Sequence, residues 1–226
     1  MYGWRARIGV IYPSTGLKDH DFFRMSPPGV SVHIYRVGWI GTGTADDIKS
    51  MSETSNLEHA ARLLAGVGPS CITWADTSGS FLFGSGGDQA QVSAMSKAGG
   101  VPASTTSTAL LAALTALRLT RVVVASPYRD DVNDPLAEFL ASHKAEVLRL
   151  EALEFSEADM FPLVARVDRE TQYSLVKRAW SPDAQGIVVP CTDFFDLDLI
   201  ELLEKDLGAP VIAANQATMW HALRLS

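Results

Sequence analysis

The chain has 226 residues, of which 47% are hydrophobic, so it can bury a proper core in one large domain or two small ones. Its formal net charge is -7, and its 19 Lys and Arg residues are scattered among 26 Asp and Glu residues without forming a basic cluster. This balance argues against nucleic acids and anionic membranes as partners, and it favours a small molecule.

The N-terminal segment MYGWRARIGVIYP carries charges early, and its apolar run is too short for a signal peptide or a membrane span. We therefore expect a cytoplasmic protein. The only two cysteines, Cys71 and Cys191, are expected to be thiols in a reducing compartment. No pair of the five histidines has the spacing of metal ligands, so no metal site is expected.

Short β-branched runs alternate with helical patterns along the first half of the chain, which is typical of a parallel sheet. Residues 7–16 predict a strand followed by a loop with a proline, and residues 30–37 predict a second strand. Residues 45–68 predict a helix, because apolar side chains recur at every third or fourth position. The segment at 71–81, CITWADTSGSF, predicts a strand that ends in a polar loop. A further helix follows it, and a strand introduced by Gly-x-Pro and a final helix close the half, at 100–102 and 108–119.

The second half repeats the same order of elements. Its corresponding segments are, in chain order, 121–130, 145–153, 169–182, 186–196, 208–210 and 216–226. The loop prolines Pro13 and Pro127 precede Asp76 and Cys191 by nearly the same number of residues. The sequence therefore predicts an α/β fold of two similar Rossmann-like domains, each with a parallel sheet, related by a pseudo-twofold axis. We expect the N-terminal domain at 1–117, completed by 213–226, and the C-terminal domain at 118–212.

Two of the predicted strands end in residues that carry chemistry, and ligands bind beyond the carboxyl ends of parallel strands. If the two domains face each other, Asp76 and Cys191 lie at equivalent corners of one cleft. The pattern at 194–208 predicts a helix directly behind Cys191, whose N-terminus is expected to lower the pKa of the thiol. The hydroxyls of Thr77 and Ser78 form an anion-holding loop. These groups predict a site for a carboxylate or an enolate.

The duplicated frame, the TSGSF loop at 77–81 and the late strand-end Cys191 resemble the aspartate/glutamate racemase superfamily. Within it the chain is similar to the arylmalonate decarboxylase family, almost throughout 107–141 and over most of its length, and it is related to the maleate isomerases. The resemblance implies that Cys191 is the proton donor and that no metal or organic cofactor is used. It also implies a dioxyanion hole from three hydroxyls, those of Thr77, Ser78 and Tyr128.

The resemblance also implies residues that bind the substrate around this dioxyanion hole. Backbone amides near Ser14 and Thr192 are expected to assist the dioxyanion hole, and Trp39, Ile40 and Phe81 to form walls of an apolar pocket.

Asp76 departs from the family pattern, because the racemases and maleate isomerases have a second cysteine there and the arylmalonate decarboxylases have a glycine. A carboxylate beside a dianionic malonate would repel it by roughly a few kcal/mol at an effective dielectric constant of about 20. Three alternatives stay open: Asp76 is protonated, it faces a cationic group of the substrate, or it turns away from the cleft. A strand-end Asp before Thr and Ser is also typical of a turn that bonds its own backbone.

The leading hypothesis is a cofactor-independent decarboxylase of a substituted malonate, acting as a monomer or small homo-oligomer on a small-molecule carboxylate. The alternative is a racemase or cis-trans isomerase of a small carboxylic or amino acid, with Asp76 and Cys191 on opposite faces. A third is a binding or sensor protein that holds a carboxylate without turnover. A fourth is an enzyme for an amine-bearing acid whose ammonium group pairs with Asp76.

Overall fold

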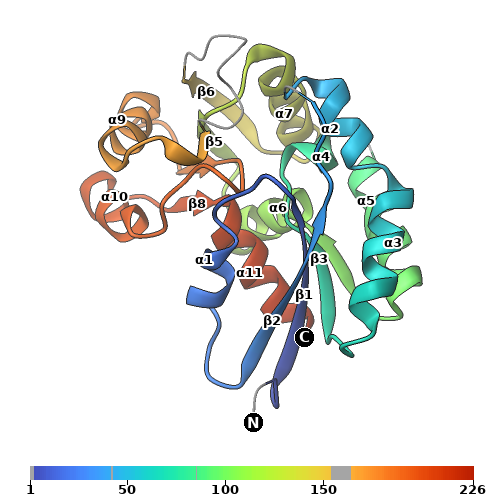
Figure 1. Ribbon diagram of the computed structural model, residues 1–226. Coiled ribbons are helices and arrows are strands. Elements are labelled where there is room, and N and C mark those ends of the chain that lie inside the picture. The colour runs from blue at the N-terminus through green and yellow to red at the C-terminus, as the bar shows by residue number, and fades with distance from the viewer. Residues whose placement is uncertain (1–2, 42, 85, 154–163) are drawn as a thin grey trace.

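The computed structural model describes residues 3–41, 43–84, 86–153 and 164–226, and it contains two sheets of four parallel strands flanked by helices (Figure 1). The first sheet has the strand order β2-β1-β3-β4. Its strands are β1 (Ala6–Pro13), β2 (Val30–Val37), β3 (Cys71–Trp74) and β4 (Ala103–Thr105).

The second sheet has the order β6-β5-β7-β8, which is the same pattern shifted by one half of the chain. Its strands are β5 (Arg121–Ser126), β6 (Glu146–Ala152), β7 (Gly186–Val189) and β8 (Val211–Ala213). All neighbouring strands in both sheets run parallel. The predicted fold of two similar parallel α/β units is therefore confirmed.

Helices follow the strands as the repeat requires. Those of the first half are α1 (His20–Arg24), α2 (Ala45–Met51), α3 (Thr54–Ala65), α4 (Ser78–Phe81), α5 (Gly87–Gly99) and α6 (Thr106–Leu117). Those described in the second half are α7 (Asp130–Ser142), the short 3-10 helix η1 (Val164–Arg166), α9 (Arg169–Ala179), α10 (Leu199–Leu207) and α11 (Ala214–Leu225). None of the helices in these ranges combines the length and the apolarity that crossing a membrane requires.

The single helix predicted over 45–68 is in fact two, because the chain turns between α2 and α3. The side-chain amide of Asn56 donates hydrogen bonds to the carbonyl oxygens of Ser50 and Met51, at 3.2 and 3.0 Å. Those carbonyls end α2 without intrahelical partners, so a side chain from the next helix satisfies them. The apolar spacing continues across the break, and that periodicity therefore could not reveal it.

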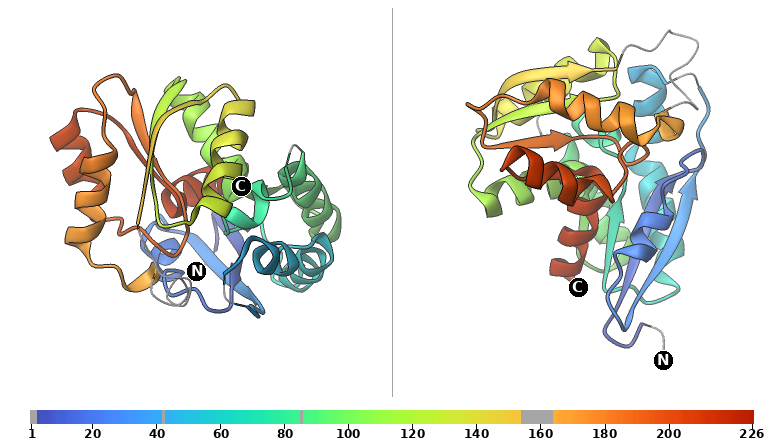
Figure 2. Two further views of the ribbon diagram at one scale, coloured as in Figure 1. Left: turned by 90° about the horizontal axis from the view of Figure 1, so that it is seen from above. Right: turned by 90° about the vertical axis from the view of Figure 1, so that its left-hand side faces the viewer.

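The closing helices of the two halves lie side by side between the sheets (Figure 1). From α6, Ala109 and Leu110 belong to the hydrophobic core around the second sheet. From α11, Met219 and Ala222 belong to a core on the first sheet. The closing helix of each half therefore contributes side chains to the core of the other half. The chain ends near the first sheet, which is also where it begins (Figure 2). The limits 1–117 with 213–226, and 118–212, stay a prediction.

Candidate active site

The loops that follow β1, β3, β5 and β7 meet in one cavity of about 30 Å³. These are the inner strands of the two sheets, at the places where the strand order reverses, and ligands of parallel α/β sheets bind at such reversals. The lining residues are Tyr12, Pro13, Thr15, Gly16, Asp76, Thr77, Ser78, Tyr128, Cys191, Thr192 and Asp193. All five predicted catalytic residues are therefore brought together, along with Thr192.

A larger cavity of about 390 Å³ lies between α6, β8 and α11, away from these loops. Its lining is mainly apolar and includes Leu117, Val211 and Trp220. Its one carboxylate, Glu204, accepts the backbone N–H of Val211 at 3.0 Å. The smaller cavity is the better candidate for chemistry, because it is where nucleophilic, acidic and hydroxyl side chains converge.

Cys191 lies in a strained turn directly after β7. Its φ of 75° is in the left-handed region, which costs a non-glycine residue roughly 1–3 kcal/mol and is most often found at functional sites. Its backbone N–H donates to Oγ1 of Thr77 at 3.1 Å, so a residue of the first half holds the turn of the second. This contact holds the strained turn, and with it Cys191, at the cavity wall.

The Cys191 thiol is held in its protonated form. Burial raises its pKa well above the ordinary value, the negative charge of Asp193 adds to this, and the backbone N–H of Asp193 offsets part of it. The charge of Asp76 raises the pKa of the thiol by a smaller amount, and the hydrogen bond with the Tyr128 hydroxyl lowers it by a smaller amount. The thiol is therefore a neutral acid at physiological pH, as proton donation requires.

The prediction that a helix N-terminus lowers the pKa of this thiol is wrong. The helix begins only at Leu199, because the Asp196 carboxylate accepts the backbone N–H of Asp198 at 3.0 Å and holds a turn. The apolar pattern that suggested a helix from 194 instead supplies core residues, including the fully buried Phe194.

Asp76 is both a turn former and a cavity residue. Its Oδ1 accepts the backbone N–H of Gly79 at 2.6 Å and the hydroxyl of Ser78 at 3.2 Å, which closes the turn into α4. Burial raises its pKa to about 6; the bonds from Gly79 and Ser78 oppose this rise, and the charge of Asp193 adds to it. Asp76 therefore changes protonation close to neutral pH, in the same cavity as the thiol.

Tyr128 is fixed by its backbone and its ring. Its N–H donates to Oγ of Ser126 at 3.0 Å, and its carbonyl accepts from the Asn133 amide at 2.7 Å. The ring meets Phe81 edge-on, with centroids 6.4 Å apart. Sequence analysis did not single out Ser126 or Asn133, although Asn133 lies in the same SPYRDDVN run as Tyr128.

The Tyr128 hydroxyl faces three of the predicted catalytic residues. It interacts with the side chains of Ser78 and Thr77, and also with the Cys191 thiol. Burial raises its pKa well above the ordinary value, followed by the charges of Cys191 and Asp76. A neutral phenol that stays protonated is a donor to any anion in the cavity.

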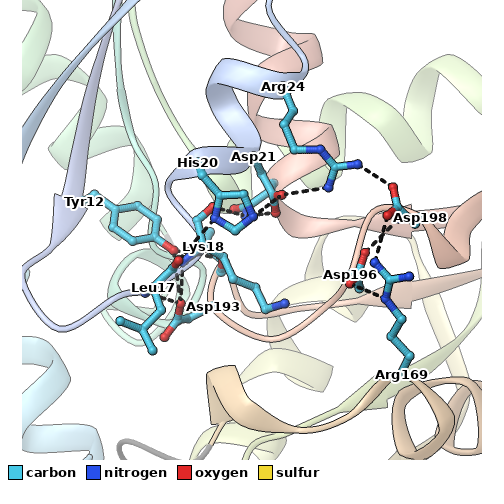
Figure 3. A network of polar contacts seen from close by, with 12 residues as sticks. Tyr12, Leu17, Lys18, His20, Asp21, Arg24, Arg169, Asp193, Asp196 and Asp198 are labelled. Atoms are coloured by element: carbon cyan, nitrogen blue, oxygen red, sulfur yellow. Dashed lines mark hydrogen bonds and ion pairs between the residues drawn. The ribbon is translucent and has the colours of Figure 1, made fainter.

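Asp193 and Tyr12 complete the site, and neither was predicted. Oδ1 of Asp193 accepts the backbone N–H groups of Leu17 and Lys18 at 2.6 and 3.0 Å, and the Tyr12 hydroxyl lies 3.5 Å away (Figure 3). That hydroxyl donates to the carbonyl of Thr192 at 3.0 Å. The signal available in the sequence was an acidic residue two positions after the cysteine.

The predicted substrate-binding residues divide into one at the cavity and three outside its lining. The hydroxyl of Thr192 donates to the carbonyl of Ala75 at 3.1 Å. The N–H of Ser14 donates to Val37, and its hydroxyl oxygen accepts the N–H of Trp39 at 2.9 Å. Ile40 is 90% exposed.

Trp39 and Ile40 follow β2, an edge strand of the first sheet. The loop that carries them therefore begins one strand away from the pair β1 and β3, where the strand order reverses. The structure does not place them in the cavity wall. Phe81 is buried in the core and supports Tyr128 from behind.

The cavity lining contains two carboxylates and no lysine, arginine or histidine. Among the residues that the structure describes, no group of three or more His, Cys, Asp or Glu side chains could hold a metal ion. The second cysteine, Cys71, is buried and donates its S–H to the carbonyl of Ala222 at 3.2 Å, so it belongs to the core. An anion bound among these lining residues would be held by neutral hydroxyl and amide donors.

Comparison with known proteins agrees with this geometry. The sequence profile described as arylmalonate decarboxylase matches residues 47–226. The arylmalonate decarboxylase of Bordetella bronchiseptica is 35% identical over 224 residues, which are 97% of this chain and 90% of that protein.

Solved structures show the same relation. A variant of arylmalonate decarboxylase with a glycine-to-cysteine and a cysteine-to-serine substitution, in the liganded form, has a TM-score of 0.88 at 33% identity and covers 97% of this chain and 92% of its own. The maleate isomerase of Pseudomonas putida S16 has a TM-score of 0.87 at 21% identity, with coverage of 97% and 92%, which is a likeness of fold. The chain belongs to the arylmalonate decarboxylase family, a family of enzymes.

Proposed function

We propose that this protein is a decarboxylase of a substituted malonate and that Cys191 protonates the product. The observation that carries the proposal is a single, buried, protonated thiol facing three hydroxyl groups in one cavity. Membership of the arylmalonate decarboxylase family supports the reaction type. The reaction needs no cofactor, because hydroxyl donors and one acid supply all that its two steps require.

In the first step the bond between the α-carbon and one carboxylate breaks, and carbon dioxide leaves. The electron pair passes to the remaining carboxylate, which becomes an enediolate. Thr77, Ser78 and Tyr128 are its proposed donors, in a buried site where hydrogen bonds to developing charge are strong. To donate, the Ser78 hydroxyl turns from Oδ1 of Asp76 to the substrate. Because Oγ1 of Thr77 accepts the N–H of Cys191, its own proton is free to point at the substrate.

In the second step the Cys191 thiol gives its proton to one face of the α-carbon. The product is a monocarboxylate, and the thiolate takes up one proton from water before the next turnover. The backbone N–H of Asp193 and the Tyr128 hydroxyl stabilise the transient thiolate. One proton is consumed for each molecule of carbon dioxide released.

A second candidate is a racemase or isomerase of a small carboxylic or amino acid, and the position of Asp76 favours it. Asp76 lines the same cavity as Cys191, and its pKa of about 6 suits an acid or base near neutral pH. A cationic substrate group paired with Asp76 is the related case of an amine-bearing acid. The two candidates differ in whether carbon is lost.

The substrate is proposed to be a small-molecule carboxylate and the location cytoplasmic. The two free cysteines support a reducing compartment. A monomer or small homo-oligomer is proposed as the working assembly.

Proton NMR in D₂O tests both candidates at once. The purified enzyme is incubated with 2-aryl and 2-alkyl malonates, and separately with single enantiomers of 2-substituted acids and amino acids. Carbon dioxide release with one deuterium on one face, lost in Cys191→Ala, supports the decarboxylase. Deuterium incorporation with inversion and no carbon loss supports the racemase, whereas full decarboxylation by Cys191→Ala removes the assigned donor.

A further inference from the structure

The carboxylate of Asp193 connects the two halves across the cavity. It stands two residues after Cys191, and its Oδ1 accepts two consecutive backbone N–H groups of the loop at 14–18, from Leu17 and Lys18. Tyr12, at the end of β1, adds its hydroxyl to the same carboxylate and to the Thr192 carbonyl (Figure 3). Hydrogen bonds to a charged acceptor are about twice as strong as neutral ones.

The loop at 14–18 forms one wall of the cavity, through Thr15 and Gly16. The cavity measures about 30 Å³, which is roughly the share of one water molecule, whereas sites for small molecules enclose about 300–1,000 Å³. A substituted malonate is larger than this space, so part of the lining must move to admit it. The loop at 14–18 is held to the second half by Asp193, and within the first half Arg36 donates to its Ser14 and Gly16 carbonyls at 3.1 and 2.9 Å.

A second contact between the halves, Arg24 with Asp198, lies further out. Asp198 pairs with Arg24 of α1 and, at 2.8 Å, with Arg169 of α9 (Figure 3). The side chains of Arg24, Asp198 and Arg169 are 47, 47 and 60% exposed, and exposed ion pairs contribute little. Asp193 is half-buried, and it makes the charge-assisted contact between this loop and the second half.

Asp193 also acts on the thiol. After burial, its negative charge is the largest cause of the raised pKa of Cys191. The titratable groups around these two residues are Tyr12, Lys18, Asp19, Asp76 and Tyr128. Burial raises the pKa of Asp193 above its ordinary value, and the backbone N–H groups of Leu17 and Lys18 oppose that rise, as does the charge of Lys18, the cation among these groups.

We propose that Asp193 is a positioning residue that docks the loop at 14–18 onto the Cys191 turn, so that closing the cavity and retaining the thiol proton are one event. When the loop is docked, its N–H groups offset part of the effect of burial on the Asp193 carboxylate, and the thiol is shielded from water. When the loop leaves, the thiol becomes hydrated and loses its proton more easily. Its value for catalysis rests on the proposed function, because retaining the proton matters only if Cys191 is the donor.

The first test measures the thiol without any substrate. Alkylation of Cys191 by iodoacetamide is followed by peptide mass spectrometry in the wild type, Asp193→Asn and Asp193→Glu, from pH 6 to the highest pH at which each protein stays folded, because the raised pKa of the thiol puts the wild-type midpoint in the alkaline range. Asp193→Asn is expected to speed alkylation at pH 8 at least ~10-fold and to move the midpoint of the rate profile to lower pH. Asp193→Glu, which restores the charge, is expected to move the midpoint back toward that of the wild type.

The matched control is Asp198→Asn, the same change in the outer set of bonds, for which no change in rate or midpoint is expected. Circular dichroism establishes that each variant is folded. A midpoint in Asp193→Asn equal to that of the wild type overturns the coupling, even if the rate rises uniformly. So does an equal response in Asp198→Asn.

The second test uses turnover of a malonate that the wild type decarboxylates. Asp193→Asn is expected to lower kcat/KM at least ~10-fold, with a loss that grows above pH 7 as the thiol loses its proton. A loss independent of pH contradicts the coupling. If the wild type decarboxylates nothing, the proposed function fails, while the alkylation profiles still decide whether Asp193 docks the loop and retains the proton.

Discussion

Replacing Asp76 by asparagine is expected to stabilise the fold at neutral pH. Asp76 is 9% exposed, and burial raises its pKa from 3.8 to about 6. A rise of about two pH units corresponds to roughly 3 kcal/mol. Asparagine keeps an oxygen for the Gly79 N–H and the Ser78 hydroxyl, and it carries no charge to desolvate.

The sign follows from proton binding. The folded protein holds the Asp76 proton more tightly than the unfolded chain, so the free energy of unfolding falls as pH rises from about 4 to 6. Above pH 6 the full cost is present, and below about pH 4 it is nearly gone because both states are protonated. Asp76→Asn therefore gains up to about 3 kcal/mol at pH 7.5 and less than about 1 kcal/mol at pH 4.

Urea unfolding followed by circular dichroism, at pH 4 and pH 7.5, measures this difference. At pH 7.5 a gain of about 3 kcal/mol corresponds to a rise in melting temperature of roughly 6–12 °C. The control is Asp168→Asn, the same change at an exposed helix N-cap whose pKa is lowered by Thr171, where no stabilisation is expected. A destabilised Asp76→Asn, or a gain that is equal at both pH values, refutes this reasoning.

The same variant separates the two candidate reactions. A carboxylate within about 5 Å of a substrate anion costs roughly 3 kcal/mol at an effective dielectric constant of about 20. If Asp76 only opposes a dianionic malonate, Asp76→Asn raises kcat/KM for decarboxylation. If Asp76 is the second acid or base, the variant loses deuterium incorporation and inversion. A stabilising change that removes activity is the usual sign of a functional residue.

Three further substitutions test the other residues of the site. Cys191→Ala is expected to lower product formation at least ~100-fold with little change in KM, measured by NMR, because it removes the acid. Tyr128→Phe is expected to lower kcat roughly 100-fold in the same assay while the fold is kept, since the ring still packs on Phe81. Thr77→Val is expected to lower the free energy of unfolding by about 1–3 kcal/mol in urea, because the buried N–H of Cys191 loses its acceptor.

The parts of the site that were predictable from the sequence follow from the order of strands. Parallel strands bring their carboxyl ends to one edge, so the polar residues that end the 71–81 and 186–196 segments had to meet if the halves faced each other. The repeated order of elements indicated that the two halves face each other, and the resemblance to the family predicted Tyr128 as a site residue. Whether a given hydroxyl reaches the cavity depends on loop conformation, which periodicity does not encode.

The features that sequence analysis missed depend on contacts between distant segments. Asp193 joins residues at 17 and 18, far away in the chain, and nothing local distinguishes it from an ordinary turn residue. The predicted direction of the Cys191 pKa shift was wrong. The apolar spacing from residue 194 predicted a helix start, but these residues pack in the core and the helix begins at Leu199. Trp39 and Ile40 do not line the cavity, because they follow β2 at the sheet edge, and the position of β2 in the sheet is set by tertiary structure; their role in substrate binding stays a prediction.

The duplicated fold places two equivalent corners at one cavity, and the titratable residues at these corners differ in pKa. Asp76 and Cys191 occupy matching positions after β3 and β7, and each corner is tied to the other half by a threonine, Thr77 or Thr192. Burial raises both pKa values, yet it leaves Asp76 with one of about 6 and Cys191 protonated far above that. Near neutral pH one corner is thus mainly a base and the other an acid. Under the proposed mechanism a symmetric fold therefore carries one-sided chemistry: a proton leaves from the side of Cys191, and the protonation and role of Asp76 decide whether the opposite face of the substrate reacts as well.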